Sequence, residues 1–280
     1  MCLFFFGPPV TVTTVQNILN ILTNIAAESL AETWDNVGLL IGSPLDQVTS
    51  ILIGLDPTSQ LISQADELHS ELVITHHPVI FHPLKALRVD QPEGRIISKA
   101  LAKKINIIGC HTNLDSAHGG VSDVLAHTLG VSNPQPLVAA DSCDLKCGLG
   151  RIGNLAAAVP VEDFLATLDK ALTPPWLLEA GPRPQKISRV AVCGGSCSDF
   201  AQTALIQGAD VFITAEIKHS TARWAEESGL WLIDAGHFAT ENPAMAALQA
   251  MLTKECAQEG IHVKIHTARQ KSPLQLIIPS

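Results

Sequence analysis

Three short segments of the sequence gather histidine and carboxylate side chains directly after apolar runs. They are Thr75-His76-His77-Pro78, His111-Thr-Asn-Leu-Asp115 and His237-Phe-Ala-Thr-Glu241. The apolar runs before them, at 71–74, 105–110 and 230–233, are typical of short strands. Imidazole and carboxylate are common ligands of divalent transition metals, and α/β sheets carry their sites at strand ends. These residues suffice for two metal ions, so metal-dependent chemistry is the leading hypothesis.

The adjacent histidines also have a simpler explanation when they are taken alone. Neighbouring side chains on a regular strand point to opposite faces, so His76 and His77 reach one cavity only if the strand ends there. Pro78 favours such an end because it disfavours helical geometry at the residue before it. The alternative is one buried and one exposed histidine with unrelated roles.

The other two segments carry their own alternatives. Asp115 can bind one metal or bridge two, or it can be the N-cap of a helix over 116–129. His237 and Glu241 are four residues apart, which places them on one side of a helix. Pro243 fits best in the first turn of a helix, so the segment is alternatively a polar loop before that helix. The recurrence of the same residue types at three strand ends favours a shared metal site.

Five further residues are candidates to orient these ligands. His111 is either a ligand itself or a partner that holds one. Asp56 and Glu216 end other strands and could position water or substrate. Asp35 and Asn36 lie in a loop that enters a strand. Capping and turn formation are the alternative for these last four residues.

Four cysteines offer a second candidate site. Cys143 and Cys147 form one pair and Cys193 and Cys197 another, each with a three-residue spacer where zinc sites usually have two. The alternative for Cys193-Gly-Gly-Ser-Cys197 is a tight turn whose small residues let a ligand, a helix or a phosphate approach. Seven cysteines in total are an odd number, which fits a reducing compartment better than a disulfide framework.

The composition is that of a globular protein with a sizeable core. Of 280 residues, 46% are hydrophobic and 16% are charged, enough for one large domain or two small ones. The net charge of −9 disfavours broad binding to nucleic acid or to an anionic membrane. The apolar run 3–6 is too short for a signal peptide, and no run approaches the roughly 20 apolar residues of a membrane span. We therefore expect a cytoplasmic protein.

Apolar periodicity predicts strands that alternate with helices. A first helix follows Thr13 or Thr14 and runs to residue 25, and a loop at 34–42 enters a strand. The other predicted strands are 51–55, 72–75, 105–110, 151–159, 189–193, 210–214 and 230–233, with short ones at 263–265 and 274–278. The further predicted helices are 58–69, 94–104, 116–129, 161–172, 199–207, 220–228 and 242–254. This alternation indicates parallel βαβ units and the α/β class.

The two halves of the sequence are similar. The segment 50–54 aligns with 189–193 at an offset of 139, and an offset of 126 places His111 on His237. The similarity predicts two similar α/β units that face each other, although βαβ units of ordinary length also give such offsets by chance. A rise in Pro, Asn and Gly content at 131–153 marks the predicted boundary between them.

Four motifs together resemble one known family. The segments 34–42 (Trp-Asp-Asn-Val-Gly-Leu-Leu-Ile-Gly), 75–78, 111–115 and 236–241 are similar, in this order, to those of the NGG-interacting-factor-three-like family. Members of that family carry the name GTP cyclohydrolase I type 2 homologue. The resemblance covers nearly the whole chain and fits the compact form without an inserted domain. Ala215 and Cys197 depart from the glycine-rich family pattern, but neither is among the ligands.

The resemblance implies two similar α/β lobes per subunit with a dinuclear metal cleft between them. The first lobe would comprise 1–130 plus 235–280, and the second would comprise 131–234. The implied ligands are His76, His77, Asp115, His237 and Glu241. Such mixed ligands suit two divalent metal ions per subunit, with Zn, Fe, Mn, Co and Ni all admissible. The family also implies a homohexamer ring.

A dinuclear centre predicts hydrolysis, in which metal-activated water attacks a small-molecule substrate, nucleotides included. The sequence carries no recognisable guanine pocket. Two other functional classes are alternatives. One is a non-catalytic metal-binding adaptor or metal-handling ring protein. The other is binding of nucleic acid by the ring, which the charge of −9 disfavours.

Overall fold

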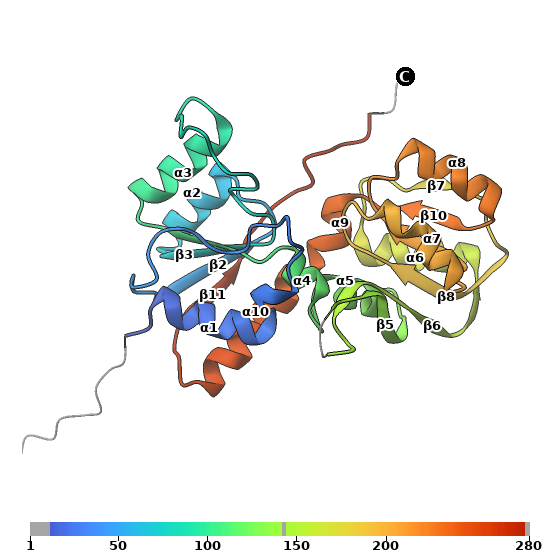
Figure 1. Cartoon of the computed structure of the whole chain (residues 1–280), viewed down its shortest axis with the longest axis horizontal. Helices are drawn as coiled ribbons and strands as arrows, with labels where there is room; N and C mark the ends of the chain where they lie inside the picture. Colours follow the sequence, from blue (N-terminus) through green and yellow to red (C-terminus); the bar gives the residue numbers. More distant parts are fainter. Residues whose placement is uncertain (1–11, 142–143, 278–280) are drawn as a thin grey trace, which may run out of the picture.

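The computed structural model describes residues 12–141 and 144–277, which fold around two separate β-sheets (Figure 1). The first sheet has the strand order β1-β4-β3-β2-β11, and the second has the order β5-β6-β8-β9-β10-β7. The sheets lie side by side along the long axis of the molecule, each with its own helices. The predicted α/β class with two lobes is therefore confirmed.

The elements have the following bounds. The strands of the first sheet are β1 Gly38–Ile41, β2 Ser50–Gly54, β3 Leu72–Thr75, β4 Asn106–Gly109 and β11 Lys264–Thr267. The strands of the second sheet are β5 Ser132–Ala139, β6 Gly148–Pro160, β7 Leu178–Ala180, β8 Lys186–Val192, β9 Val211–Thr214 and β10 Trp231–Asp234. The α-helices are α1 Val15–Ile25, α2 Ser59–Glu67, α3 Pro92–Ala102, α4 Thr112–Ser116, α5 Val121–Thr128, α6 Val161–Leu172, α7 Ala201–Ile206, α8 His219–Ser228, α9 His237–Glu241 and α10 Pro243–Gln258.

Both sheets are parallel at the centre and have antiparallel strands at an edge. The strands β2, β3 and β4 are parallel, as are β8, β9 and β10. Ile51 pairs with Leu72 in the first sheet, and Val190 pairs with Val211 in the second, at the offset of 139 present in the sequence. The two halves therefore share both the order and the register of these strands.

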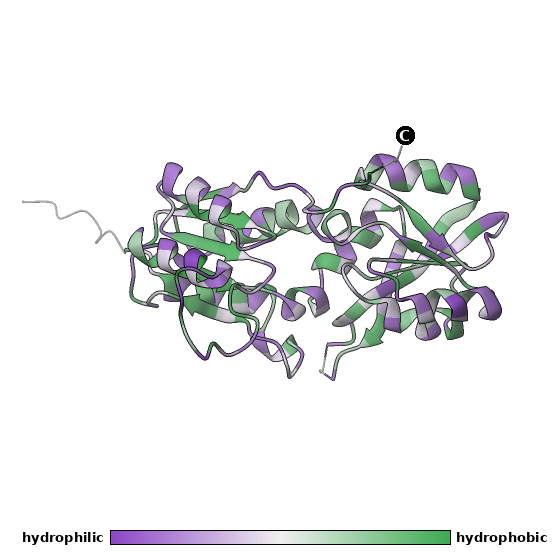
Figure 2. Ribbon diagram, turned by 90° about the horizontal axis from the view of Figure 1, so that it is seen from above, coloured by the Kyte–Doolittle hydropathy of each residue, from purple (hydrophilic) through white to green (hydrophobic). Residues whose placement is uncertain are grey.

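The central strands are buried on both faces, as their unbroken apolar runs predict. Every residue of β3, β4, β9 and β10 is buried. In the first lobe, α2 and α3 cover one face of the sheet, and α1 and α10 cover the other. In the second lobe, α6 covers one face, and α7 and α8 cover the other. Figure 2 shows apolar residues along the inner strands and polar residues on the outer helices.

Two predicted segments have a particular local structure. Most of the segment 131–136, which its composition marks as the predicted boundary, lies in β5, the strand with which the second sheet begins. Because β5 is the edge strand of its sheet, it tolerates Pro134 and Pro136 without loss of a ladder hydrogen bond inside the sheet. Of the predicted strand 274–278, residues 274–277 are irregular, and residue 278 lies outside the described ranges.

Other features of the sequence prediction cannot be placed. The apolar run 3–6 and Cys143 lie outside the described residues. The lobe boundaries, 1–130 plus 235–280 and 131–234, stay a prediction, because α5 contributes Val121 to the core of the first lobe and Leu125 to that of the second.

Within the described ranges, no helix combines the length and the hydropathy needed to cross a lipid bilayer.

A buried ion pair joins the two lobes. Asp123 lies on α5 and Arg151 on β6, and both are almost fully buried. The guanidinium donates two hydrogen bonds to the carboxylate, of 2.7 Å from Nε to Oδ1 and 2.8 Å from Nη2 to Oδ2. Its other N–H groups donate to the carbonyls of Gly148, Gly150 and Ala117. Such complete pairing permits the burial of two charges and fixes the start of β6 to the connection after α4.

We predict that Arg151→Met lowers the free energy of unfolding by about 3–5 kcal/mol, because it leaves the buried Asp123 carboxylate without its partner. Urea unfolding followed by circular dichroism measures the change. Arg223→Met is the control, since Arg223 pairs with Glu226 at the exposed surface, and the unfolding midpoint should not move. Equal shifts in the two variants would contradict the role of the buried pair.

Candidate metal centre

The five predicted ligands meet between the two lobes, where β3, β4 and β10 end. Two adjacent histidines follow β3, the short helix α4 follows β4, and the short helix α9 follows β10. With His111, the donor atoms of these residues form three groups, and within each group the atoms lie within 4.8 Å of one another. The groups are His76 with Asp115 and Glu241, His77 with His237 and Glu241, and His76 with His77 and His111.

The local structure removes the alternatives that the sequence left open for Asp115 and Glu241. Asp115 lies inside α4 and is not a helix N-cap, because the helix predicted over 116–129 begins only after Gly120. Its Oδ1 lies 3.6 Å from His76 Nε2. His237 and Glu241 lie on one helix, α9, rather than in an exposed polar loop. Both carboxylates are therefore directed at the histidines.

Glu241 is the central residue of the cluster. Its side chain is almost fully buried. Its Oε1 lies 3.7 Å from His76 Nε2, while its Oε2 lies 3.1 Å from His77 Nε2 and 3.0 Å from His237 Nε2. The two carboxylate oxygens thus face different imidazoles, Oε1 that of His76 and Oε2 those of His77 and His237.

Each of the four imidazoles is oriented by an oxygen atom at Nδ1. His76 Nδ1 lies 2.9 Å from the carbonyl oxygen of Cys110, which can only accept a hydrogen bond, so Nδ1 carries a proton and Nε2 faces the cluster. Carboxylates take the same place in the other three rings. The pairs are His77 with Asp56 at 2.7 Å, His111 with Asp35 at 2.8 Å and His237 with Glu216 at 3.1 Å. This pattern is usual around metal-binding histidines.

Four of the five candidate orienting residues thus contact the cluster, and Asn36 does not. Asp35 binds His111 and also accepts a hydrogen bond of 2.9 Å from the backbone N–H of Thr112, which fixes the start of α4. The Asn36 amide instead donates to the carbonyl of Ile80 at 2.6 Å. Asn36 therefore holds a neighbouring loop and orients no histidine.

Two buried atoms of the cluster have no partner within hydrogen-bond distance in the described part of the chain. They are His76 Nε2 and Asp115 Oδ1, which lie 3.6 Å apart. An unpaired polar atom in the interior costs free energy, so such atoms indicate a missing partner. Both residues belong to one donor group with Glu241. A divalent cation between the two atoms would satisfy both, so the residues fit a metal centre.

Carboxylates dominate the electrostatics of the cluster. Burial by itself lowers the pKa of His77, but hydrogen bonds to Asp56 and Glu241 outweigh it and raise that pKa to about 10. Burial likewise opposes the effect of Glu241 at His237, whose pKa rises to about 9. Burial raises the pKa of Asp115 to about 6 although the His76 imidazole is close. The carboxylates concentrate negative charge here, which raises the pKa values of the imidazoles. A divalent cation bound in place of the imidazole protons would compensate the same charge.

A glycine turn after β8 lets α9 approach closely, and the sequence analysis did not assign this role. Gly195 has a φ of 73°, and a Cβ atom there would lie 2.2 Å from Glu241 Oε1 and 3.3 Å from His237 Nε2. The hydroxyl of Ser196 lies against Glu216 and 3.4 Å from His237 Nδ1. The tight turn expected at 193–197 is confirmed, but the group that approaches it is a carboxylate of the protein.

Gln270 is a second residue that the sequence analysis missed. Its Oε1 accepts hydrogen bonds from the N–H groups of Leu55, at 2.6 Å, and Asp56, at 3.2 Å. Its Nε2 donates to the carbonyl of Asp56 at 2.7 Å. The side chain thus extends the pairing of β11 with β2 beyond the end of the strands. It fixes the backbone of the residue that orients His77.

The candidate four-cysteine site gains no support from the cysteines that the structure describes, and Cys143 lies outside them. No donor group of metal-binding type within 12–141 and 144–277 contains a cysteine. The thiol of Cys147 lies 3.6 Å from a carboxylate oxygen of Asp144. A hydrogen bond with Cys197, together with burial, raises the pKa of the Cys193 thiol well above its usual value.

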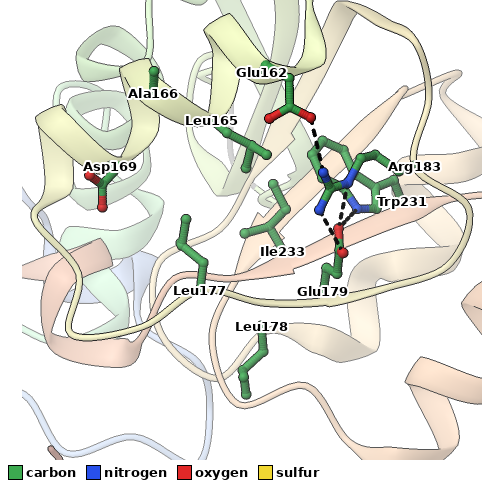
Figure 3. A pocket seen from close by; sticks show the side chains of 10 residues that line it. All are labelled: Glu162, Leu165, Ala166, Asp169, Leu177, Leu178, Glu179, Arg183, Trp231 and Ile233. Atoms are coloured by element: carbon green, nitrogen blue, oxygen red, sulfur yellow. Dashed lines mark hydrogen bonds and ion pairs between the residues drawn. The ribbon is translucent and has the colours of Figure 1, made fainter. Parts of the chain in front are cut away.

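The cluster opens into a cavity of about 700 Å³. A separate hollow of about 460 Å³ lies in the second lobe (Figure 3). In that hollow, Arg183 binds Glu162 and Glu179, and the indole N–H of Trp231 donates to Glu179. Four of its polar side chains thus bind one another, whereas the cluster at the histidines has buried donor atoms without a partner. The chemistry therefore belongs to the cavity at the histidines.

We predict that Gly195→Ala weakens metal binding by about 10–100-fold, because the new methyl group displaces Glu241. A competition titration against a chromophoric chelator measures the affinity. Gly208→Ala is the matched control, since Gly208 has a similar φ of 77° and a Cβ there would meet only Arg189 Cδ at 4.0 Å. Equal losses in both variants would show that backbone strain, and not contact with Glu241, is responsible.

Known proteins resemble this chain over most of its length. A family model described as Duf34/NIF3 (NGG1p interacting factor 3) matches residues 13–273. A protein of Clostridium perfringens named GTP cyclohydrolase 1 type 2 homolog is 34% identical over 231 residues, which cover 82% of this chain and 88% of the relative. A protein of the same name from Clostridium acetobutylicum is 31% identical over 251 residues, which cover 90% and 94%.

Solved structures share the fold. A Bacillus cereus protein related to NIF3 superposes with a TM-score of 0.89 at 23% identity, over 95% of this chain and 100% of the other. A hypothetical protein of Staphylococcus aureus superposes with a TM-score of 0.88 at 30% identity, over 94% and 99%. With the family match over residues 13–273 and the relatives above 30% identity, the chain belongs to the Duf34/NIF3 family.

Proposed function

We propose that the cluster holds two divalent metal ions and that the protein is a metal-dependent hydrolase of a small molecule. The observation that carries this proposal is the position of Glu241, of which one oxygen faces His76 and the other faces His77 and His237. One ion would be held by His76, Asp115 and Glu241, with His111 as a further ligand. The other would be held by His77, His237 and Glu241.

Two ions held in this way would lower the pKa of water and polarise a carbonyl or phosphoryl oxygen, which is the chemistry of hydrolysis. Mixed imidazole and carboxylate ligands suit Zn, Fe, Mn, Co or Ni. The name of the relatives, GTP cyclohydrolase 1 type 2 homolog, adds a guanine nucleotide to the candidate substrates.

The protein's own groups orient the ligands and hold protons. Asp56 accepts the Nδ1–H of His77, and Glu216 accepts that of His237, so both Nε2 lone pairs are directed at the cluster. His76 is buried, whereas His77 and His237 are partly exposed and line the cavity together with Glu241. A substrate would therefore approach from the cavity, on the side of His77 and His237.

We expect the protein, purified without oxygen, to contain about two metal ions per chain by elemental analysis. His77→Ala should lower the content to about one ion and abolish hydrolysis, because it removes one ligand of the second ion. His262→Ala is the control, since His262 is exposed and belongs to none of the donor groups. Circular dichroism would verify that both variants are folded.

The outcomes separate this proposal from its alternatives. A wild-type protein that binds no metal on titration would contradict the metal centre altogether. Two ions per chain without turnover, after exchange through Zn, Fe, Mn, Co and Ni, would favour a metal-binding adaptor or metal-handling protein. The homohexamer ring is proposed on family membership alone, and sedimentation velocity would measure its mass.

A further inference from the structure

Two histidines of the cluster border a second, smaller cavity. Its volume is about 220 Å³, and both His77 and His237 line it, as they line the larger cavity. Asp56 and Glu216, which bind the Nδ1 atoms of these two rings, line only the smaller cavity. The smaller cavity therefore lies at the rear of the two ligands, on the side of the carboxylates that orient them.

Three parts of the chain that are far apart in the sequence enclose this cavity. One belongs to the first lobe, the second comprises α9 and the loop before β7, and the third is the segment after β11. We call residues 271–277, in that last segment, the strap. Figure 1 shows the strap running from the first sheet past α9 toward the second lobe. The apolar residues that line the cavity are Leu55, Trp176, Phe238, Pro273 and Leu274.

The strap is held firmly only where it begins. The side chain of Gln270 binds the backbone of Asp56 through both its oxygen and its nitrogen atom. Beyond Gln270, the hydrogen bonds of residues 271–277 within the described ranges join only Ser272 with Leu274. A segment held in this way can leave the cavity without breaking a hydrogen bond to either lobe.

Leu274 is the residue through which the strap closes the cavity. Leu274 and Leu276 have the same exposed fraction, 58%, but only Leu274 is part of the lining. Trp176, another part of the lining, packs against Gly236, where a Cβ atom would lie 3.9 Å from its Cζ2 atom. Gly236 directly precedes His237 in the chain. The strap and Trp176 thus form an apolar shield beside a proposed ligand.

An apolar shield of this kind controls the access of water to a metal site. An ion leaves protein ligands when water takes their place, so shielding of His77 and His237 slows the exchange of an ion that they hold. His76 is fully buried and does not line the smaller cavity. Opening of the strap would therefore affect one of the two proposed ions and not the other.

We propose that the strap is a gate for one metal ion. In the closed position, Leu274 shields the rear of His77 and His237, and opening of the strap admits the water that exchanges the ion there. The ion at His76 and Asp115 does not depend on the strap. This inference rests on the proposed function, because it requires both ions. It adds a route of metal exchange that is distinct from the cavity in which a substrate would bind.

Release of Zn²⁺ from the zinc-loaded protein to an excess of a chromophoric chelator, followed by stopped-flow absorbance, tests the inference. Leu274→Ala should speed the release of one of the two ions at least about threefold and leave the other unchanged. Leu276→Ala is the matched control, since Leu276 is equally exposed but does not line the cavity. Leu274→Met, which keeps an apolar side chain of similar size, should retain the wild-type rate.

A second measurement needs no metal. Hydroxyl-radical labelling of the metal-free protein, resolved to single residues by mass spectrometry, reports the exposure of Trp176. Leu274→Ala should raise the labelling rate of Trp176, and Leu276→Ala should not. Trp231, which is fully buried in the second sheet, should react equally slowly in all variants and so verifies that they are folded.

Unchanged zinc release in Leu274→Ala, or equal acceleration in Leu274→Ala and Leu276→Ala, would overturn the inference whatever the labelling shows. Equal acceleration for both ions would indicate general loosening of the cluster and would also overturn it. A wild-type protein that binds no zinc refutes the proposed function together with this inference. Two bound zinc ions whose release does not depend on Leu274 refute this inference alone.

Discussion

The structure depends on the compensation of one buried carboxylate. Glu241 is almost fully withdrawn from solvent between the lobes, where an unpaired charge would cost several kcal/mol. His76 and His77 from the first lobe, and His237 from α9, bring nitrogen atoms to its two oxygens. The strand ends, the short helices and the glycine turn after β8 all serve to make that convergence sterically possible. The same excess of negative charge is what fits the centre to divalent cations.

The lobes are held together independently of any bound ion. The chain passes from the second lobe to the first through α9 and α10, and α10 packs in the core of the first lobe. The pair of Asp123 and Arg151 adds a second, fully hydrogen-bonded joint between α5 and β6. These two connections fix the position of one lobe relative to the other. The ligand side chains therefore need only small movements to adjust to a metal ion.

Much of the site could be predicted because its ligands follow strands whose apolar runs are unmistakable. The strand 72–75 and the helix 161–172 agree with β3 and α6 at both ends. The rest depends on contacts between residues far apart in the chain, which periodicity does not encode. Gln270 hydrogen-bonds to Asp56, which is 214 positions away. Gly195 matters because a side chain there would meet the Glu241 carboxylate of α9. Asn36 binds the carbonyl of Ile80 in a loop and does not contact the cluster.

The position of Gln270 has a consequence for the order in which the protein is made. The second sheet uses only residues between β5 and β10, whereas β2 needs β11 as its parallel neighbour, and Asp56 needs Gln270. A chain emerging from the ribosome can complete the second sheet while the first still lacks a strand. The histidines after β3 are synthesised long before Glu241 and Gln270. The centre therefore cannot be assembled until residue 270 has been added.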